Sequence, residues 1–161
     1  MFIIEKVTAK EQLNTCLDII HKSFITVADE FGLTKDNCPN HTAFMSIEKL
    51  EKQYKNGTDI FMYNHNGAYV GYFSLSDNGE CVELNNLSVL PEYRHLGIGK
   101  KMVEYAKDYA INNTNAKRIA IGIIEDNAVL ERWYESLGFI HTGTKRFISL
   151  PFTVGFMELI I

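Results

Sequence analysis

The chain has 161 residues, of which 46% are hydrophobic and 22% are charged, proportions that are ordinary for a soluble globular protein. Its net charge of −4 lacks the basic excess that a nucleic-acid-binding surface requires. Its apolar runs stay below the roughly 18 residues that cross a bilayer. We therefore expect no nucleic-acid partner, no membrane partner, and one domain over residues 1–161.

The cysteines and the first residues bear on compartment and metal binding. Residues 1–5 lack the basic start and the long apolar stretch of a signal peptide. Cys16, Cys38 and Cys81 are odd in number and widely spaced, which argues against a disulfide framework. Cys38 and His41 have no second pair of ligands nearby, whereas zinc normally takes four. These features favour a cytoplasmic location and predict no metal site.

The first third of the chain reads as one strand followed by helical segments. Residues 2–7 are strand-like, and residues 13–20 repeat apolar side chains at helical spacing. A second helical piece is predicted over residues 23–31 and ends at Gly32. A third is predicted over residues 42–54.

The pattern then changes to short strands separated by turn residues. Residues 59–63 and 69–75 are strand-like and flank His65-Asn66-Gly67, which is a hairpin signal. Asp77-Asn78-Gly79 marks a second turn before a third strand over residues 82–89. These three strands should form an antiparallel meander.

A glycine-rich turn, Arg94-His95-Leu96-Gly97-Ile98-Gly99, joins the third strand to a helical pattern. Backbone N–H groups converge at a strand–turn–helix junction, and the helix dipole adds partial positive charge there. The turn therefore predicts an anion cradle for a phosphorylated cofactor, with an ordinary tight turn as the alternative. The sequence lacks both the P-loop pattern and the third glycine of a dinucleotide-binding turn.

The last third returns to the sheet. Residues 118–124 are nearly all apolar, as in a central strand, and residues 127–137 are predicted to be a helix. Residues 139–149 and 152–159 read as two final strands. The order of elements predicts an α/β fold with a single mixed, mostly antiparallel sheet and helices on both faces.

Two segments resemble motifs of a known family. The segment from Leu87 to Gly99 resembles the R/Q-x-x-G-x-G/A acetyl-coenzyme A motif of the GCN5-related N-acetyltransferase (GNAT) family. The segment from Asn127 to Phe139 resembles that family's later N-x-x-x-x-x-x-Y-x-x-x-G-F pattern. The resemblance covers residues 59–140, extends to the first third only in topology, and implies a sheet that splays between the fourth and fifth strands.

The resemblance implies acetyl-coenzyme A as co-substrate and assigns residues to it. The pyrophosphate would lie on the backbone N–H groups of Arg94, His95, Leu96, Gly97, Ile98, Gly99 and Lys100. The pantetheine arm would pair like an added strand with Leu87, Ser88 and Val89, and the N–H of Val89 would stabilise the oxyanion. Asn127 would contact the cofactor, and it suits a helix N-cap equally well.

The resemblance also gives two catalytic candidates. Tyr134 stands where the family carries its general acid, although its helical face suits a core tyrosine too. Glu83 lies where histone-acetylating members carry their base, and a structural hydrogen bond is an equal alternative. Strict alternation places Glu83, Asn85, Leu87 and Val89 on one face of the strand. Asn85 and Asn86 either line the acceptor site or form a bulge.

These observations predict an N-acetyltransferase in which a primary amine attacks acetyl-coenzyme A directly, in a ternary complex. A small-molecule amine is favoured over a protein as the acceptor, and a homodimer is compatible with the sequence. The candidate residues for lining the acceptor pocket are Asp29, Glu30, Glu83, His141, Arg146 and Phe147. A non-catalytic acyl-coenzyme A-binding module and another nucleotide-cofactor α/β enzyme are the alternatives.

Overall fold

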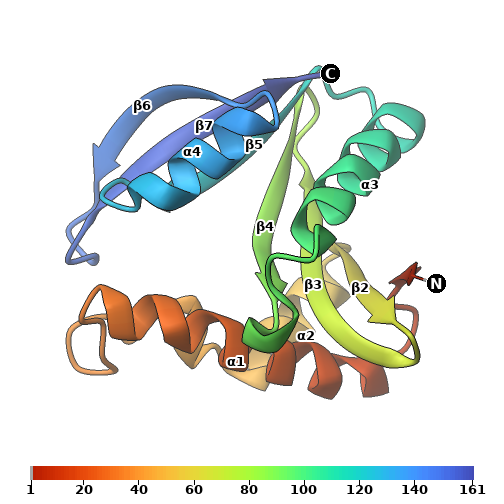
Figure 1. Ribbon diagram of the computed structural model, residues 1–161, viewed down its shortest axis with the longest axis horizontal. Helices are drawn as coiled ribbons and strands as arrows, with labels where there is room; N and C mark the ends of the chain where they lie inside the picture. Colours follow the sequence, from red (N-terminus) through yellow and green to blue (C-terminus); the bar gives the residue numbers. More distant parts are fainter. Residues whose placement is uncertain (1) are drawn as a thin grey trace.

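A computed structural model describes residues 2–161 and contains a seven-stranded sheet of order β1-β2-β3-β4-β5-β7-β6 (Figure 1). The strands are β1 (Phe2–Lys6), β2 (Asp59–His65), β3 (Ala68–Asp77), β4 (Cys81–Val89), β5 (Arg118–Ile124), β6 (Ile140–Arg146) and β7 (Thr153–Ile160). The β4–β5 pair is parallel and the other neighbouring pairs are antiparallel. The mixed, mostly antiparallel sheet predicted from the sequence is therefore confirmed.

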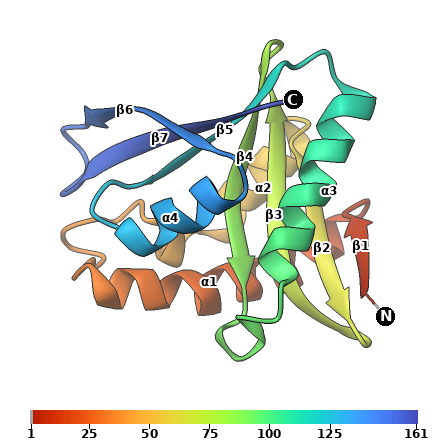
Figure 2. The ribbon, with the colours of Figure 1, turned by 45° about the horizontal axis from the view of Figure 1, so that its top comes forward.

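Helices cover both faces of this sheet (Figure 2). They are α1 (Leu13–Glu30), α2 (Ile47–Lys55), α3 (Ile98–Asn113) and α4 (Ala128–Ser136), with short 3-10 turns η1 (Lys10–Gln12), η2 (Thr42–Phe44) and η3 (Pro91–Tyr93). One apolar cluster joins the sheet to α3 and α4, and a second joins it to α1 and α2. No helix within residues 2–161 is long and apolar enough to cross a membrane.

The helices of the first third differ from the prediction. The two pieces expected over residues 13–20 and 23–31 form one helix, α1, because no glycine or proline interrupts them and Thr26 Oγ1 satisfies the carbonyl of Ser23 inside the helix. The piece expected over residues 42–54 is instead divided into η2 and α2. Ser46 causes the division, because its side chain accepts the N–H of Lys49 and caps α2.

The sheet opens between β4 and β5. The two strands pair only from Cys81 to Glu83 on β4, where Glu83 lies opposite Ala120. Beyond this point they diverge, as Figures 1 and 2 both show. The splay between the fourth and fifth strands is therefore confirmed, and it leaves the C-terminal half of β4 with one unpaired edge.

A bulge in β4 changes which side chains share a face. Asn86 has φ of +53°, and Asn86 with Leu87 lies opposite the single residue Phe73 of β3. The extra residue reverses the alternation. Leu87 and Val89 therefore pack against the apolar cluster on the α3 side of the sheet, which also contains Val82 and Leu84. Glu83 lies on the opposite face. The strict alternation expected for Glu83, Leu87 and Val89 is thus wrong, and the bulge alternative for Asn86 is correct.

Candidate active site

The glycine-rich turn presents backbone donors at the start of α3. Gly97 is the N-cap in a left-handed conformation, with φ of +79°, and its carbonyl accepts the N–H of Lys101 at 3.2 Å. The N–H groups of Ile98, Gly99 and Lys100 precede that bond, so they have no carbonyl one turn earlier in the helix. Three N–H groups at the positive end of a helix dipole form a cradle that fits a pyrophosphate.

The side chain of Arg94 is held by the protein. Its Nε donates to the carbonyl of Val89 at 3.1 Å, and its two terminal nitrogens donate to Thr26 Oγ1 at 3.1 Å and to the carbonyl of Ser23 at 2.9 Å. Its backbone N–H donates to the carbonyl of Pro91 within η3. Arg94 therefore ties the end of β4 to α1 and shapes the cradle through its side chain.

The unpaired edge of β4 offers a further donor. Leu90 donates its N–H to the carbonyl of Val70 on β3 at 2.9 Å. Successive N–H groups in an antiparallel ladder point alternately toward and away from the partner strand, so the N–H of Val89 points away from β3. That direction is the side on which β5 has separated. An extended ligand arm therefore has an open strand edge to pair with, between the cradle and β5.

Tyr134 is a core residue in the last turn of α4. Its ring packs edge-on against Trp133 and Phe139, with centroid distances of 4.8 and 5.2 Å. Burial raises the pKa of Tyr134 well above its ordinary value, so its hydroxyl stays protonated at neutral pH. Among the described residues this hydroxyl has no hydrogen-bond partner, which leaves it available as a donor. The core reading of Tyr134 and the acid reading are thus compatible.

Asn127 caps α4. Its Oδ1 accepts the N–H of Leu130 at 3.2 Å, so the N-cap alternative is observed directly. The cap fixes the direction of the first turn of α4. That turn carries the chain toward Tyr134 and Trp133, which face the cradle side of the splay.

Glu83 lies at the apex of the splay with its side chain exposed. Within residues 2–161 it forms no ion pair. The neighbouring carboxylate across Ala120, that of Glu158, is bound instead by Arg118 at 3.2 Å. A free, solvent-accessible carboxylate at this position can accept a proton from an ammonium group.

The cysteines lack the features of a nucleophile. Cys16 and Cys38 are buried, and Cys81 is partly buried. Burial raises the pKa of the Cys16 thiol to about 12 and also raises the pKa values of the other two thiols. A raised pKa suppresses the thiolate that nucleophilic attack requires. In the described part of the chain, no group of three or more histidine, cysteine or acidic residues is arranged to hold a metal ion.

Two histidines have partners that the sequence did not indicate. His141, a candidate lining residue, lies beside α4 and pairs with Glu125 at 2.9 Å. His41, weighed in the sequence as a metal ligand with Cys38, has its ring edge-on to Phe24 at 6.2 Å. The adjacent Thr42 donates to Asn86 Oδ1 at the β4 bulge, 3.2 Å away. The aromatic spacing on α1 was the available signal for these contacts. It could not show that the segment containing His41 and Thr42 folds back to β4.

The comparison with protein families decides the identity of the fold and its chemistry. The family described as "Acetyltransferase (GNAT) family" matches residues 27–139. The chain belongs to this family. It is accordingly an acetyl-coenzyme A-dependent acyltransferase, and members of the GNAT family acetylate amines.

This GNAT chain is similar in sequence to one curated relative and similar in fold to two solved structures. It is 28% identical over 125 residues to the 5-NmdU N-acetyltransferase of Pseudomonas phage PaMx11, a match that spans 76% of this chain and 82% of the relative. The ribosomal-protein-S18-alanine N-acetyltransferase of Escherichia coli has a TM-score of 0.77 at 17% identity, covering 100% of this chain and 94% of its own. The PaiA N-acetyltransferase of Thermoplasma acidophilum, solved in complex with coenzyme A, has a TM-score of 0.77 at 20% identity, covering 100% and 99%.

Proposed function

We propose that the chain transfers the acetyl group of acetyl-coenzyme A to a primary amine of a small molecule, by direct attack in a ternary complex. The observation that carries the proposal is the open edge of β4. It runs from the bulge at Asn86 to Val89, between the donors at the start of α3 and the hydroxyl of Tyr134. A thioester on that edge would lie beside both an N–H donor and a protonated phenol.

The cofactor would be held by backbone groups on both sides of the turn. The pantetheine arm would pair with Leu87, Ser88 and Val89, where the side chain of Ser88 is turned inward and donates to the carbonyl of Asn86 at 2.7 Å. The N–H groups along the turn would bind the pyrophosphate. These belong to His95, Leu96, Gly97, Ile98, Gly99 and Lys100, with Arg94 acting through the shape of the turn, and Asn127 would contact the arm from the start of α4.

The protein residues then have distinct roles in the transfer. Glu83 would take a proton from the ammonium, directly or through water, so that the neutral amine can attack the thioester carbonyl. The N–H of Val89 would donate to the oxygen on which negative charge develops. The carbon–sulfur bond would break as the amide forms, and the nitrogen would lose its second proton to solvent. Tyr134 would give its proton to the sulfur and later recover one from solvent.

Contacts near the opening support a small acceptor. Leu150 and Phe152, from the connection between β6 and β7, belong to the same apolar cluster as Val27 and Phe31 of α1. This packing joins the β6–β7 connection to α1, and it would restrict the entry of a folded protein surface from that side. A slim amine is therefore favoured over a protein chain.

A thiol-release screen tests the proposal. Acetyl-coenzyme A is supplied with a library of small primary amines and with a short peptide that begins with alanine, and products are identified by mass. Release of free thiol with an acetylated small amine supports the proposal. Binding of acetyl-coenzyme A by calorimetry without thiol release from any acceptor would indicate a binding module, and acetylation of the peptide alone would contradict the small-molecule assignment.

A further inference from the structure

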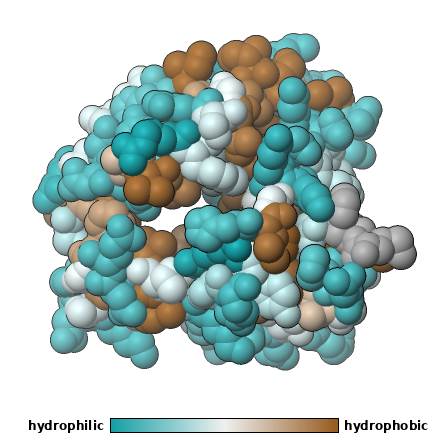
Figure 3. Space-filling view, in the orientation of Figure 1, coloured by the Kyte–Doolittle hydropathy of each residue, from teal (hydrophilic) through white to brown (hydrophobic). Residues whose placement is uncertain are grey.

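An opening passes between the layer of α1 and the layer formed by β5, β7 and α4. Figure 3 shows this hollow, with hydrophobic side chains bordering it from both layers. Glu83 lies at its inner end, because it shares a face with Ala120 of β5 and this face is turned toward α1. The walls of the opening would therefore surround the molecule that carries the reacting amine.

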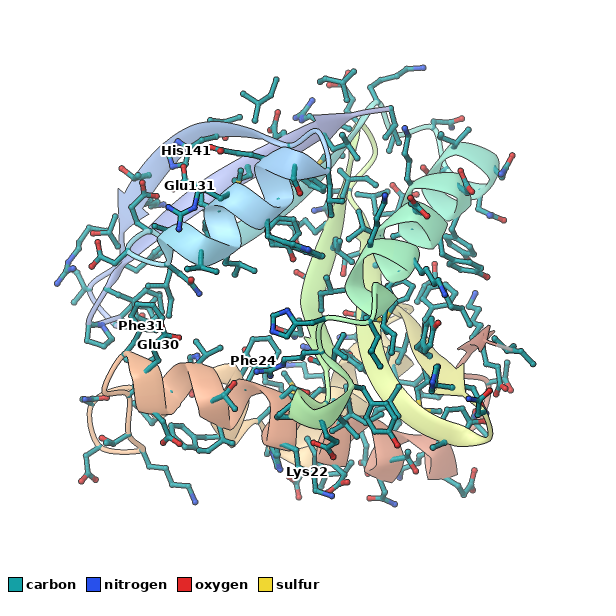
Figure 4. The ribbon with its side chains drawn as sticks, viewed as in Figure 1. Lys22, Phe24, Glu30, Phe31, Glu131 and His141 are labelled. Atoms are coloured by element: carbon teal, nitrogen blue, oxygen red, sulfur yellow. The ribbon has the colours of Figure 1, made fainter. Side chains whose placement is uncertain are left out.

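Aromatic side chains from α1 form one wall. Phe24, Val27 and Phe31 follow one another at helical spacing, and all three are half-buried against the cluster that contains Ile124 of β5. Figure 4 shows Phe24 and Phe31 on the side of α1 that faces the opening, whereas Lys22 lies on the opposite side. The same view places the carboxylate of Glu30 on this side, beside Phe31. The α1 wall is thus mainly aromatic and apolar, with one acidic residue at the end that carries Phe31.

A flat apolar surface on β7 forms the opposite wall. Phe156 pairs with Gly122 of β5, and alternation places both on the same face as Ile124, toward α1. Phe156 keeps 36% of its surface exposed, and Gly122 has no side chain to cover it. An exposed aromatic ring next to a glycine offers a surface on which another ring can stack.

The charges at the inner end of the opening suit a ligand with one positive group. Glu83 has a free carboxylate there, whereas Glu158 on the same face is already paired with Arg118. Burial lowers the pKa of His41, so its ring is neutral at pH 7. Because Nδ1 of His41 accepts the N–H of Ala43, the proton resides on Nε2, where the ring can donate a hydrogen bond without repelling an ammonium group.

A second groove is less suited to an amine. It lies between α1 and the segment leading to α2, and its lining includes His21, Lys22 and Lys35 but no carboxylate. Basic groups there would repel an ammonium. The opening beside Glu83 is therefore the better acceptor site on grounds of charge.

Resting on the proposed function, we propose that the acceptor is a primary amine carried on a flat aromatic or heteroaromatic ring. The ring lies between α1 at Phe24 and β7 at Phe156, and the amine is directed toward Glu83. Stacking and cation–π contacts with these walls distinguish such an acceptor from an aliphatic amine of equal size. At the inner end of the opening a polyamine would find only the carboxylate of Glu83 among the described acidic residues of β4, β5 and β7 there, because Glu158 is already paired with Arg118.

A matched pair of acceptors tests this inference. Benzylamine and cyclohexylmethylamine have similar size but differ in aromaticity, and each is assayed by thiol release with the wild type and with Phe156→Leu. The variant should raise KM for benzylamine roughly three- to tenfold while KM for cyclohexylmethylamine and for acetyl-coenzyme A stays unchanged. Comparing the variant with the wild type cancels the difference in basicity between the two amines.

The control variant is Tyr105→Leu. Tyr105 has the same 36% exposure as Phe156 but lies on α3, against Phe61 and Phe73. It should leave both KM values unchanged. Equal effects of Phe156→Leu on both amines, or efficient turnover of spermidine in preference to benzylamine, would overturn the inference and leave the proposed function standing. Absence of turnover with every amine would contradict the proposed function itself, and the inference with it.

Discussion

The indole of Trp133 lies against the backbone of Gly99, so closely that a Cβ added to Gly99 would come within 3.0 Å of the ring. This contact joins α4 to the first turn of α3, across the region where β4 and β5 separate. The only tryptophan of the chain therefore reports on the proposed cofactor cradle.

Acetyl-coenzyme A should change the fluorescence of Trp133 when it binds. Gly99→Ala should displace the indole and shift its emission in the free protein. It should also weaken the binding of acetyl-coenzyme A and destabilise the fold by about 1–3 kcal/mol through overpacking. Gly122→Ala is the control for emission and stability, since its Cβ would meet Val154 at an ordinary 3.5 Å. Fluorescence titration and thermal unfolding measure these effects. An emission spectrum of wild type that is insensitive to saturating acetyl-coenzyme A would argue against a cradle at this turn.

Arg94 connects the cradle with the acceptor side. Arg94→Lys loses the forked contacts to Val89, Ser23 and Thr26, which one ammonium group cannot replace. We expect the free energy of unfolding to fall by about 1–3 kcal/mol. Because α1 forms one wall of the opening, KM for the amine should rise by a larger factor than kcat falls. Arg132→Lys, at an exposed position of α4, should change neither quantity. Wild-type KM values in Arg94→Lys would show that the link is not needed for acceptor binding.

The pair of His141 and Glu125 should make stability depend on pH. The hydrogen bond to Glu125 raises the pKa of His141, and the charges of Glu131 and Glu135 add to the effect. A raised folded-state pKa means that the contribution is complete below the unfolded value of about 6.5 and is lost as pH rises through the folded value. Tm should therefore fall more steeply as the pH rises above about 6.5 in the wild type than in His141→Gln. His65→Gln serves as the control, and parallel Tm profiles for wild type and His141→Gln would refute the linkage.

Glu83→Gln should reduce kcat/KM mainly at low pH. Most of the amine is protonated there and needs a base, whereas a larger neutral fraction reacts unaided near pH 9 and above. The loss should be about tenfold or more near pH 7 and should shrink as pH rises. Glu80→Gln, which alters an exposed carboxylate on the adjacent turn, should leave the profile unchanged. A pH-independent loss in Glu83→Gln would indicate a binding role in place of proton transfer.

The sequence predicted the strands and the antiparallel meander of β2, β3 and β4, because both depend on local patterns of apolar and turn residues. The glycine-rich turn, for example, reads directly as the left-handed cap that Gly97 provides. The splay was implied by resemblance to a family, since nothing within β4 or β5 alone predicts that their pairing stops after Glu83.

Features that depend on distant contacts were not predictable. Asn85 and Asn86 are equally able to adopt a left-handed conformation, so the position of the bulge, and with it the reversed alternation of Leu87, was open. The guanidinium of Arg94 reaches α1, which is 68 residues away from it at Thr26. Phe24 and Phe156, which we propose as walls of the acceptor site, come from opposite ends of the chain, so the sequence alone did not associate them.

The most direct test of the central claim is the rate of acetyl transfer by Tyr134→Phe. The hydroxyl of Tyr134 has no partner among the described residues, so its removal should leave the packing with Trp133 and Phe139, the Tm and the affinity for acetyl-coenzyme A unchanged. Tyr109→Phe is the converse control: it removes contacts to Lys6 and Asp59 and should lower Tm without changing the rate.

The measurement is single-turnover thiol release with saturating acetyl-coenzyme A and a productive amine. Tyr134→Phe is predicted to slow the chemical step by about a hundredfold or more, the range typical of a lost general acid. A wild-type rate in a folded Tyr134→Phe variant that still binds acetyl-coenzyme A would contradict the account.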